Sequence, residues 1–293
     1  MIKPISPCLW FNGEAKSAAE LYCSVFNNSI ITVDTPMVVT FQLNGQRFMG
    51  LNGGPSHTIN PSISFFVVCD TTEELDAAWK ELSINGSVMM PLDSYPWSER
   101  YGWVADRFGV NWQLSLGKLA EVGQKFTPTL MFVGVQQGKA REAIDFYTTV
   151  FDRSEIVGIL PYAESDPDVT DTIKHAQFKL NGDVFMAMDS SAAHDFQFDE
   201  GISLVVECDT QEEIDRYWNA LLQNGGREDQ CGWLKDQFGV SWQIVPSILA
   251  KLMSDPGKAP KVMAALLKMK KFDIGQLITA SESQQPLSKL EEN

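Results

Sequence analysis

The sequence reads GWVADRFGVNWQ from residue 102 to residue 113 and GWLKDQFGVSWQ from residue 232 to residue 243. These two stretches are identical at eight of twelve positions. Chance does not give a match of this length, so the chain contains an internal repeat. A repeat must be found before a fold is assigned, because missing one misassigns the whole architecture.

Two further pairs of segments match in the same order along the chain. The stretch FQLNGQRFM (41–49) matches FKLNGDVFM (178–186), and ISFFVVCDT (63–71) matches ISLVVECDT (202–210). The two halves of the chain are therefore duplicates, with their boundary between Gly123 and Thr127. We predict a first domain over residues 1–123, a second over 128–246, and a helical extension over 247–293 that has no counterpart in the first half.

Each half predicts the same order of elements. In the first half, a short apolar stretch precedes a helix over Glu14 to Phe26, whose apolar residues recur at helical spacing. Three strands follow, and Asn44-Gly45 between the last two is a strong hairpin signal. A second strand, helix and pair of strands then complete the half. The pattern indicates an α+β protein built from four βαβββ modules.

Composition and charge exclude several classes of protein. The chain has 293 residues, of which 44% are hydrophobic, so it can bury one large core or two ordinary ones. Its net charge of −15 would repel a phosphate backbone and an anionic membrane surface. The N-terminus has no signal-peptide pattern, which favours a cytoplasmic protein. The five cysteines contain no C-x-x-C pair, so we expect small buried hydrophobic side chains rather than a disulfide framework or a zinc site.

The sequence resembles the vicinal oxygen chelate superfamily, which includes glyoxalases, extradiol dioxygenases and bleomycin resistance proteins. More closely, it is similar to the PhnB-like family, which is often labelled 3-demethylubiquinone-9 3-methyltransferase. The motifs that carry the resemblance are Leu9-Trp10-Phe11, Leu43-Asn44-Gly45, Leu51-Asn52-Gly53-Gly54-Pro55, Cys69-Asp70 with Trp79, the repeated Gly-Trp block and the segment Met269 to Ile274. The resemblance implies two glyoxalase/bleomycin-resistance-like domains, each with a curled mixed sheet and helices outside, joined as an internal pseudo-dimer.

The resemblance also implies a divalent metal held by His and Glu side chains from three strands. The corresponding positions here are Pro7 and Pro128, Ser64 and Ser203, and Gln113 and Gln243. Proline has no side-chain ligand and neutral serine is a poor one, so we expect no standard metal site. A glutamine carbonyl can still coordinate, which leaves an unconventional metal open. We expect no organic cofactor, because the chain lacks the G-x-G turn typical of a nucleotide or S-adenosylmethionine site on a doubly wound sheet.

Polar residues of the second half are the candidates for the site. Side chains alternate along a strand, so the second half could bring together His175, Gln177, Ser203, Glu207 and Gln243. His175 and Glu207 are the two titratable members and the candidate catalytic pair, although no catalytic residue is assigned. His175 also fits an edge histidine, and Glu207 also fits a solvated strand end.

Strand sharing in the superfamily implies how the pockets are assembled. It predicts that Pro7, Leu9 and Phe11 face Ser203, Glu207 and Gln243, and that Pro128 and Leu130 face Ser64 and Gln113. The first of these two pockets has the charge, so we expect it to be the functional one, with Phe11 and Trp233 as its apolar wall. The full set of expected ligand-binding residues is Phe11, Ser64, Gln113, Gln177, Ser203, Glu207, Trp233 and Gln243.

Three hypotheses for the function follow. The first is a metal-free small-molecule-binding protein whose ligand is unknown. The second is an enzyme acting on a small metabolite, either a lyase or isomerase that uses His175 and Glu207 or the methyltransferase of the family label. The third is an interaction protein that works through the basic extension. We expect no nucleic-acid or membrane partner, and association into a homo-oligomer remains open.

Overall fold

A computed structural model describes residues 3–283 of the chain. Residues 1–2 of the predicted first domain and residues 284–293 of the predicted extension lie outside the described residues. The elements follow the predicted order of four βαβββ modules, so the α+β class is confirmed, although the strand Ser87–Tyr95 was not among the strands predicted individually. None of the described helices is both long and apolar enough to cross a bilayer.

The bounds of the elements are as follows. The first module has β1 (Ser6–Phe11), α1 (Ala15–Val25), β2 (Ile30–Asp34), β3 (Val38–Leu43) and β4 (Gln46–Asn52). The second has β5 (Ile63–Cys69), α2 (Thr72–Leu82), β6 (Ser87–Tyr95), β7 (Ser98–Ala105) and β8 (Asn111–Leu116), followed by α3 (Leu119–Val122). The third has β9 (Phe126–Phe132), η1 (Gly134–Gln136), α4 (Ala140–Val150), β10 (Glu155–Pro161), β11 (Ile173–Leu180) and β12 (Asp183–Asp189). The fourth has β13 (Ile202–Cys208), α5 (Gln211–Leu221), η2 (Gln223–Gly225), β14 (Arg227–Glu228), β15 (Trp233–Lys235) and β16 (Ser241–Pro246), and the extension adds α6 (Ile248–Met253), α7 (Ala259–Leu266) and α8 (Ile274–Glu282).

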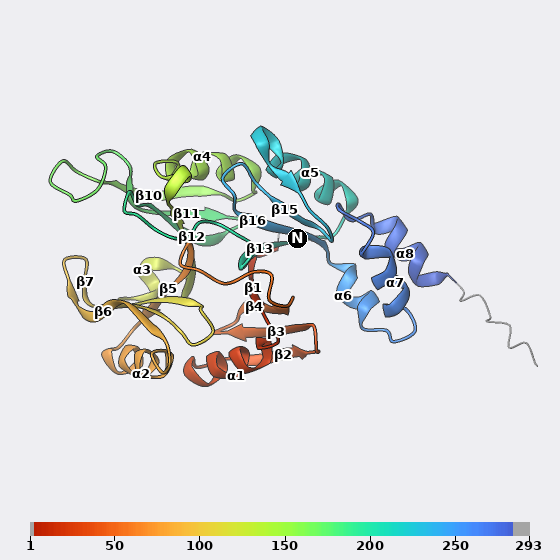
Figure 1. Ribbon diagram of the computed structural model, residues 1–293, viewed down its shortest axis with the longest axis horizontal. Coiled ribbons are helices and arrows are strands. Elements are labelled where there is room, and N and C mark those ends of the chain that lie inside the picture. The colour runs from red at the N-terminus through yellow and green to blue at the C-terminus, as the bar shows by residue number, and fades with distance from the viewer. Residues whose placement is uncertain (1–2, 284–293) are drawn as a thin grey trace, which may run out of the picture.

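Each of the two eight-stranded sheets takes one module from each half of the chain. Sheet A has the order β14-β15-β16-β13-β1-β4-β3-β2, and sheet B has the order β10-β11-β12-β9-β5-β8-β7-β6. The exchange is made by antiparallel pairs at the centre of each sheet, β1 with β13 and β5 with β9. The predicted sharing of strands between the halves is therefore confirmed. Figure 1 shows α1 and α2 on one side of the molecule, α4 and α5 on the opposite side, and the tail helices at one end.

The hairpin signals of the sequence form the tight turns that they predict. Asn44 and Gly45 have φ values of 48° and 81°, and Asn181 and Gly182 have φ values of 54° and 93°. Positive φ at both central residues matches the twist of the flanking strands, and asparagine and glycine adopt it most readily. Both turns start the last strand of a module, so they fix the registers of β4 and β12.

The repeated Gly-Trp block has a structural role in both halves. The buried Asp236 carboxylate accepts hydrogen bonds from the backbone N–H groups of Phe238 (2.9 Å) and Val240 (3.1 Å) and from the indole of Trp242 (2.8 Å). Asp106 makes the same three bonds in the first half. The block thus folds a turn around one buried carboxylate and anchors a core tryptophan, which explains why the two copies resemble each other.

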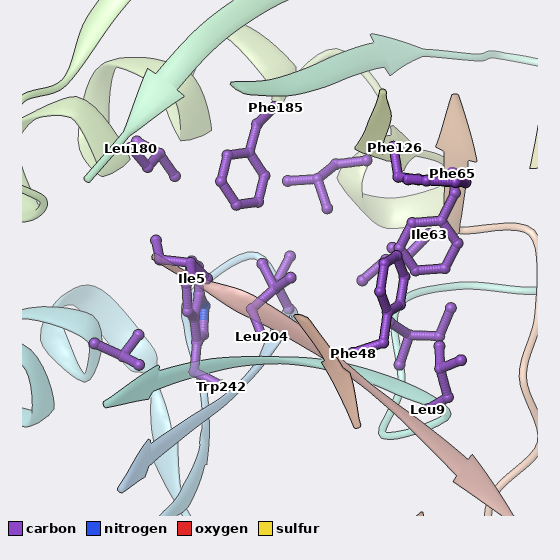
Figure 2. Packing of buried hydrophobic residues seen from close by; sticks show 14 of the residues in the cluster. Ile5, Leu9, Phe48, Ile63, Phe65, Phe126, Leu180, Phe185, Leu204 and Trp242 are labelled. Carbon is purple, nitrogen blue, oxygen red and sulfur yellow. The ribbon is translucent and has the colours of Figure 1, made fainter. Parts of the chain in front are cut away.

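A single hydrophobic core contains residues of both halves and of the extension. Figure 2 shows Phe48 of the first module and Phe126 of the third within it, and their ring centroids are 6.0 Å apart. The extension contributes buried side chains such as Phe272 and Leu277. The described part of the extension therefore packs against the rest of the molecule.

Candidate functional site

Each sheet has one face that belongs to the core and an opposite face, which we call the cup face. Alternation along the strands assigns every side chain to one of the two. In sheet A, Cys8 pairs with Ser203 and Val205 pairs with Gln243, so these residues share the cup face. In sheet B, Thr129 pairs with Ser64 and lies on the equivalent face.

The predicted contribution of β1 and β9 to the pockets is wrong by one residue. The register pairs Pro7 with Leu204 and Leu9 with Ile202, which are core residues. Phe11 is also buried in the core, where its ring lies 6.3 Å from that of Phe108. The side chains of β1 on the cup face are Ser6, Cys8 and Trp10 instead. An error of one position reverses the face because the side-chain period of a strand is two.

The same correction applies to the other pocket. Pro128 pairs with Phe65 and Leu130 with Ile63, and these pairs belong to the core face. Thr127, Thr129 and Met131 are the residues of β9 that face Ser64 and Gln113.

The structure also separates the five polar residues that the sequence grouped together. His175 and Gln177 lie on β11 of sheet B, whereas Ser203, Glu207 and Gln243 lie on β13 and β16 of sheet A. The proposed acid–base pair of His175 and Glu207 is therefore wrong. The prediction fails because strands are exchanged between the halves, which places the two modules of one half in different sheets.

Three strands converge on a small polar cluster in each cup face. In sheet A, Gln243 Nε2 donates to Ser203 Oγ at 2.9 Å, and both residues hydrogen bond with the Cys8 thiol. Burial raises the pKa of this thiol to about 11, although the two hydrogen bonds act in the opposite direction. In sheet B, Gln113 Nε2 donates to Ser64 Oγ at 2.7 Å.

This cluster does not fit the divalent metal that the superfamily implies. It offers a protonated thiol, hydroxyls and amides, and none of these carries the charge of a carboxylate or the donor strength of an imidazole. Within residues 3–283, no group of three His, Cys, Asp or Glu side chains is placed to hold a metal ion.

The cup face of sheet A is charged, but its charges are paired. Glu207 forms an ion pair with Arg47 of β4, which reaches it from the other half of the chain. Glu200 lies 3.0 Å from Lys235 and 3.4 Å from His57. The Trp233 ring, expected in the wall of this pocket, lies on this cup face and contacts the Trp10 ring edge to face at 5.8 Å.

The cup face of sheet B is mostly aromatic and methionine-rich. A hydrophobic cluster separate from the main core lies on it. Its buried members are Tyr101, Trp103, Met131 and Val133, and its half-buried members are Phe66, Met90, Tyr95, Met188 and Phe196. At its rim, Trp97 is 58% exposed and stacks on Tyr95 with a centroid distance of 5.0 Å.

Polar atoms form the floor beneath this aromatic cluster. The Tyr101 hydroxyl donates to Gln113 Oε1 at 2.8 Å, which links it through Gln113 to Ser64. The Trp103 indole donates to Asn111 Oδ1 at 3.0 Å. The Thr127 hydroxyl is buried and has no hydrogen-bond partner among the described residues.

A groove of about 340 Å³ adjoins this cup face along β10 and β11. His175 and Gln177 line it together with Gly158 and Leu160. Burial lowers the pKa of His175, which favours its neutral imidazole. The Gln177 amide donates to the carbonyl of Val122 at 3.2 Å.

The sequence analysis missed several residues of the cup faces. Arg47 gave no signal, because it neutralises Glu207 only through the exchanged strand. Cys8 and Thr129 were missed by the one-residue error on β1 and β9. Tyr101 directly precedes the repeated block in the first half, and Cys231 precedes it in the second half. This difference between the halves could have identified Tyr101 as a candidate site residue.

Comparisons with known proteins identify the family of the chain. A family model described as 3-demethylubiquinone-9 3-methyltransferase matches residues 3–115 and again residues 124–245. The solved PhnB protein from Bacillus cereus is 37% identical; the match covers 39% of this chain and 100% of that one, with a TM-score of 0.37. A protein from Staphylococcus aureus is 33% identical over 40% of this chain and 99% of its own, with a TM-score of 0.19.

A fourth comparison concerns the fold alone. Glyoxalase I from Zea mays is 11% identical, and the match covers 86% of this chain and 95% of that one with a TM-score of 0.55. No curated protein matches the chain.

Proposed function

Because the chain belongs to the 3-demethylubiquinone-9 3-methyltransferase family of the vicinal oxygen chelate superfamily, we propose that it binds a small molecule without a metal ion, on the cup face of sheet B. The aromatic cluster over the Gln113 floor is the observation that carries this proposal. Small-molecule sites are mostly apolar and aromatic, with a few placed polar groups that fix orientation. This cup face has that composition, and the groove beside His175 extends it.

The sheet-A cup face supports the proposal less well, although the sequence favoured it. The sequence favoured this face because of the charge of Glu207, and that charge is paired with the Arg47 guanidinium. A ligand that used Glu207 would have to replace an ion pair that is already made. In sheet B, by contrast, the buried Thr127 hydroxyl has no partner among the described residues, and a ligand could supply one.

The most specific enzyme hypothesis required His175 and Glu207 to act as an acid–base pair, and these two residues lie in different sheets. The methyl transfer named in the family description has no further support from the residues, because the chain lacks a glycine-rich nucleotide turn. Binding alone requires only the aromatic cluster and its polar floor, so it is the function that we propose.

Native mass spectrometry of the protein as purified tests the proposal. We expect an adduct of fixed small mass and no stoichiometric metal. Trp103→Leu should remove the adduct, because the Trp103 ring belongs to the sheet-B cluster. Trp233→Leu is the matched control, since it changes the same position of the repeat in sheet A. Loss of the adduct in the Trp233 variant alone, or a stoichiometric metal in the wild type, would contradict the proposal.

A further inference from the structure

A cavity of about 240 Å³ lies where the two halves of the chain meet, apart from the aromatic cluster of sheet B. The starts of β1, β4, β9 and β12 surround it. Three buried phenylalanines, Phe48, Phe126 and Phe185, form its apolar wall. Figure 2 shows these three rings among the packed residues between the sheets.

Most of the polar side chains in the wall already form hydrogen bonds or ion pairs within the protein. Gln46 accepts from the Phe126 N–H at 2.8 Å and donates to the Phe126 carbonyl at 2.9 Å. Gln124 accepts from the Val184 N–H and donates to the Val184 carbonyl, both at 3.0 Å. Arg47, which also lines the cavity, forms an ion pair with Glu207.

Asp183 is the exception in this wall. Its Oδ2 accepts from the Ile5 N–H at 2.7 Å, and that is the one hydrogen bond its carboxylate makes with the described residues. Burial raises the pKa of Asp183 to about 6, although the Ile5 N–H and the positive charge of Arg153 act in the opposite direction. The Arg153 guanidinium itself donates to the Asn181 carbonyl at 3.2 Å.

The repeat shows that the fold does not need a carboxylate at this position. Asp183 corresponds to Gln46 in the aligned segments FKLNGDVFM and FQLNGQRFM. Gln46 ties the start of its strand to Phe126 through two hydrogen bonds and carries no charge. Asp183 makes one such bond, to Ile5, among the described residues, and it leaves a partly buried charge in the cavity wall, which is unfavourable for folding. A perturbed carboxylate in a cavity is a candidate binding group.

We propose that this junction cavity binds a small organic cation, a primary or secondary ammonium group with an apolar substituent, and that Asp183 is its counter-ion. The ammonium would donate to the carboxylate oxygen that has no partner among the described residues, in a charge-assisted hydrogen bond. The substituent would pack against the faces of the phenylalanines, which also attract cations. The net charge of −15 raises the local concentration of cations around the protein.

Isothermal titration calorimetry with benzylammonium chloride tests this site in the full-length protein. We expect saturable binding at least about tenfold tighter than that of benzyl alcohol, which is neutral and of the same shape, because a tenfold ratio is the least that a net ion pair should give. Asp183→Gln copies the first half of the chain and should weaken benzylammonium binding by about tenfold or more while the protein stays folded. Asp183→Asn is a second variant that keeps the acceptor for Ile5 if the longer side chain does not fit.

A control separates this site from the proposed one on sheet B. Trp103→Leu should leave benzylammonium binding unchanged, whatever its effect on the sheet-B ligand. Equal affinity of the wild type and Asp183→Gln, equal affinity for benzyl alcohol, preference for benzoate, or no saturable binding of benzylammonium would each overturn the proposal.

Discussion

Asp183 is the residue whose environment is least expected from its neighbours in the sequence. It follows Asn181-Gly182 at the start of β12, where a solvated turn residue would be ordinary, yet it accepts a hydrogen bond from Ile5, which directly precedes β1. Because its folded pKa of about 6 is above the ordinary value of 3.8, its contribution to stability is fully present below pH 3.8. That contribution is lost as the pH rises through 6.

The first prediction concerns the stability of Asp183→Gln. The variant has no carboxylate to desolvate, so at pH 7.5 it should be more stable than the wild type by about 1–2 kcal/mol, after allowance for partial exposure. At pH 5 the difference should be smaller. Urea denaturation at both pH values measures it, and a difference that grows as the pH falls would refute the sign.

A second prediction at this scale concerns the five cysteines. Burial raises the pKa of Cys8 to about 11 and the pKa values of Cys69 and Cys208 to about 12. The thiolate is the reactive form, and these three side chains are also inaccessible. Iodoacetamide at pH 8 should therefore label Cys23 and Cys231 first, and label the other three only after the protein unfolds.

Peptide mapping by mass spectrometry reads out this order of labelling. Early modification of Cys8 would mean that the sheet-A cup face opens in solution. It would also contradict the buried cluster with Ser203 and Gln243.

At the scale of the element, the repeated block is a turn built around one buried carboxylate. Asp236 accepts from two backbone N–H groups, the Trp242 indole and the Tyr147 hydroxyl, the last at 2.7 Å. Its burial raises its pKa to about 6, against the effect of these donors. The turn connects β15 to β16, so it sets the position of Gln243 on the cup face.

The third prediction is that Asp236→Ala destabilises the protein strongly. The substitution leaves four donors without an acceptor in a buried place, which should cost about 3 kcal/mol or more. Asp229→Ala, which removes an exposed carboxylate near the same hairpin, is the control and should cost little. Denaturant unfolding compares the two variants, and a loss below about 1 kcal/mol for Asp236→Ala would contradict the role of the turn.

At the scale of the whole molecule, neither half of the chain can complete a sheet by itself. The first half supplies β1 to β4 of sheet A and β5 to β8 of sheet B, and the second half completes both. In residues 1–123 alone, β1 and β5 would have unpaired edges, although each is central in the full protein. An exposed, apolar edge of this kind pairs with another chain.

The fourth prediction is that the fragment 1–123 forms a homodimer. β5 of one copy resembles β13 in sequence, so it can take the place of β13 beside β1 of the other copy. Light scattering after size-exclusion chromatography measures the mass. Co-expression with the fragment 124–293 should instead give a one-to-one complex, and a folded monomer of 1–123 would show that the exchange is not required.

The sequence by itself determined the local features of this protein. The repeat, the four modules, the Asn-Gly hairpins and the absence of His and Glu at the implied metal positions depend on short-range patterns. Hairpins and amphipathic helices follow from residues within one turn or two of each other. The sequence also predicted that Ser64 lies with Gln113 and that Ser203 lies with Gln243. Each of these positions is only a few residues from a recognisable motif.

Only the tertiary structure decided which strands face each other and with which side. The β1–β13 register put Cys8 and Trp10 on the cup face in place of Pro7 and Phe11. The exchange moved His175 away from Glu207 and brought Arg47 to it. A strand presents opposite faces at successive residues, and its partners here come from distant parts of the chain. A shift of one residue, or a change of partner sheet, therefore alters the whole site while the local pattern stays the same.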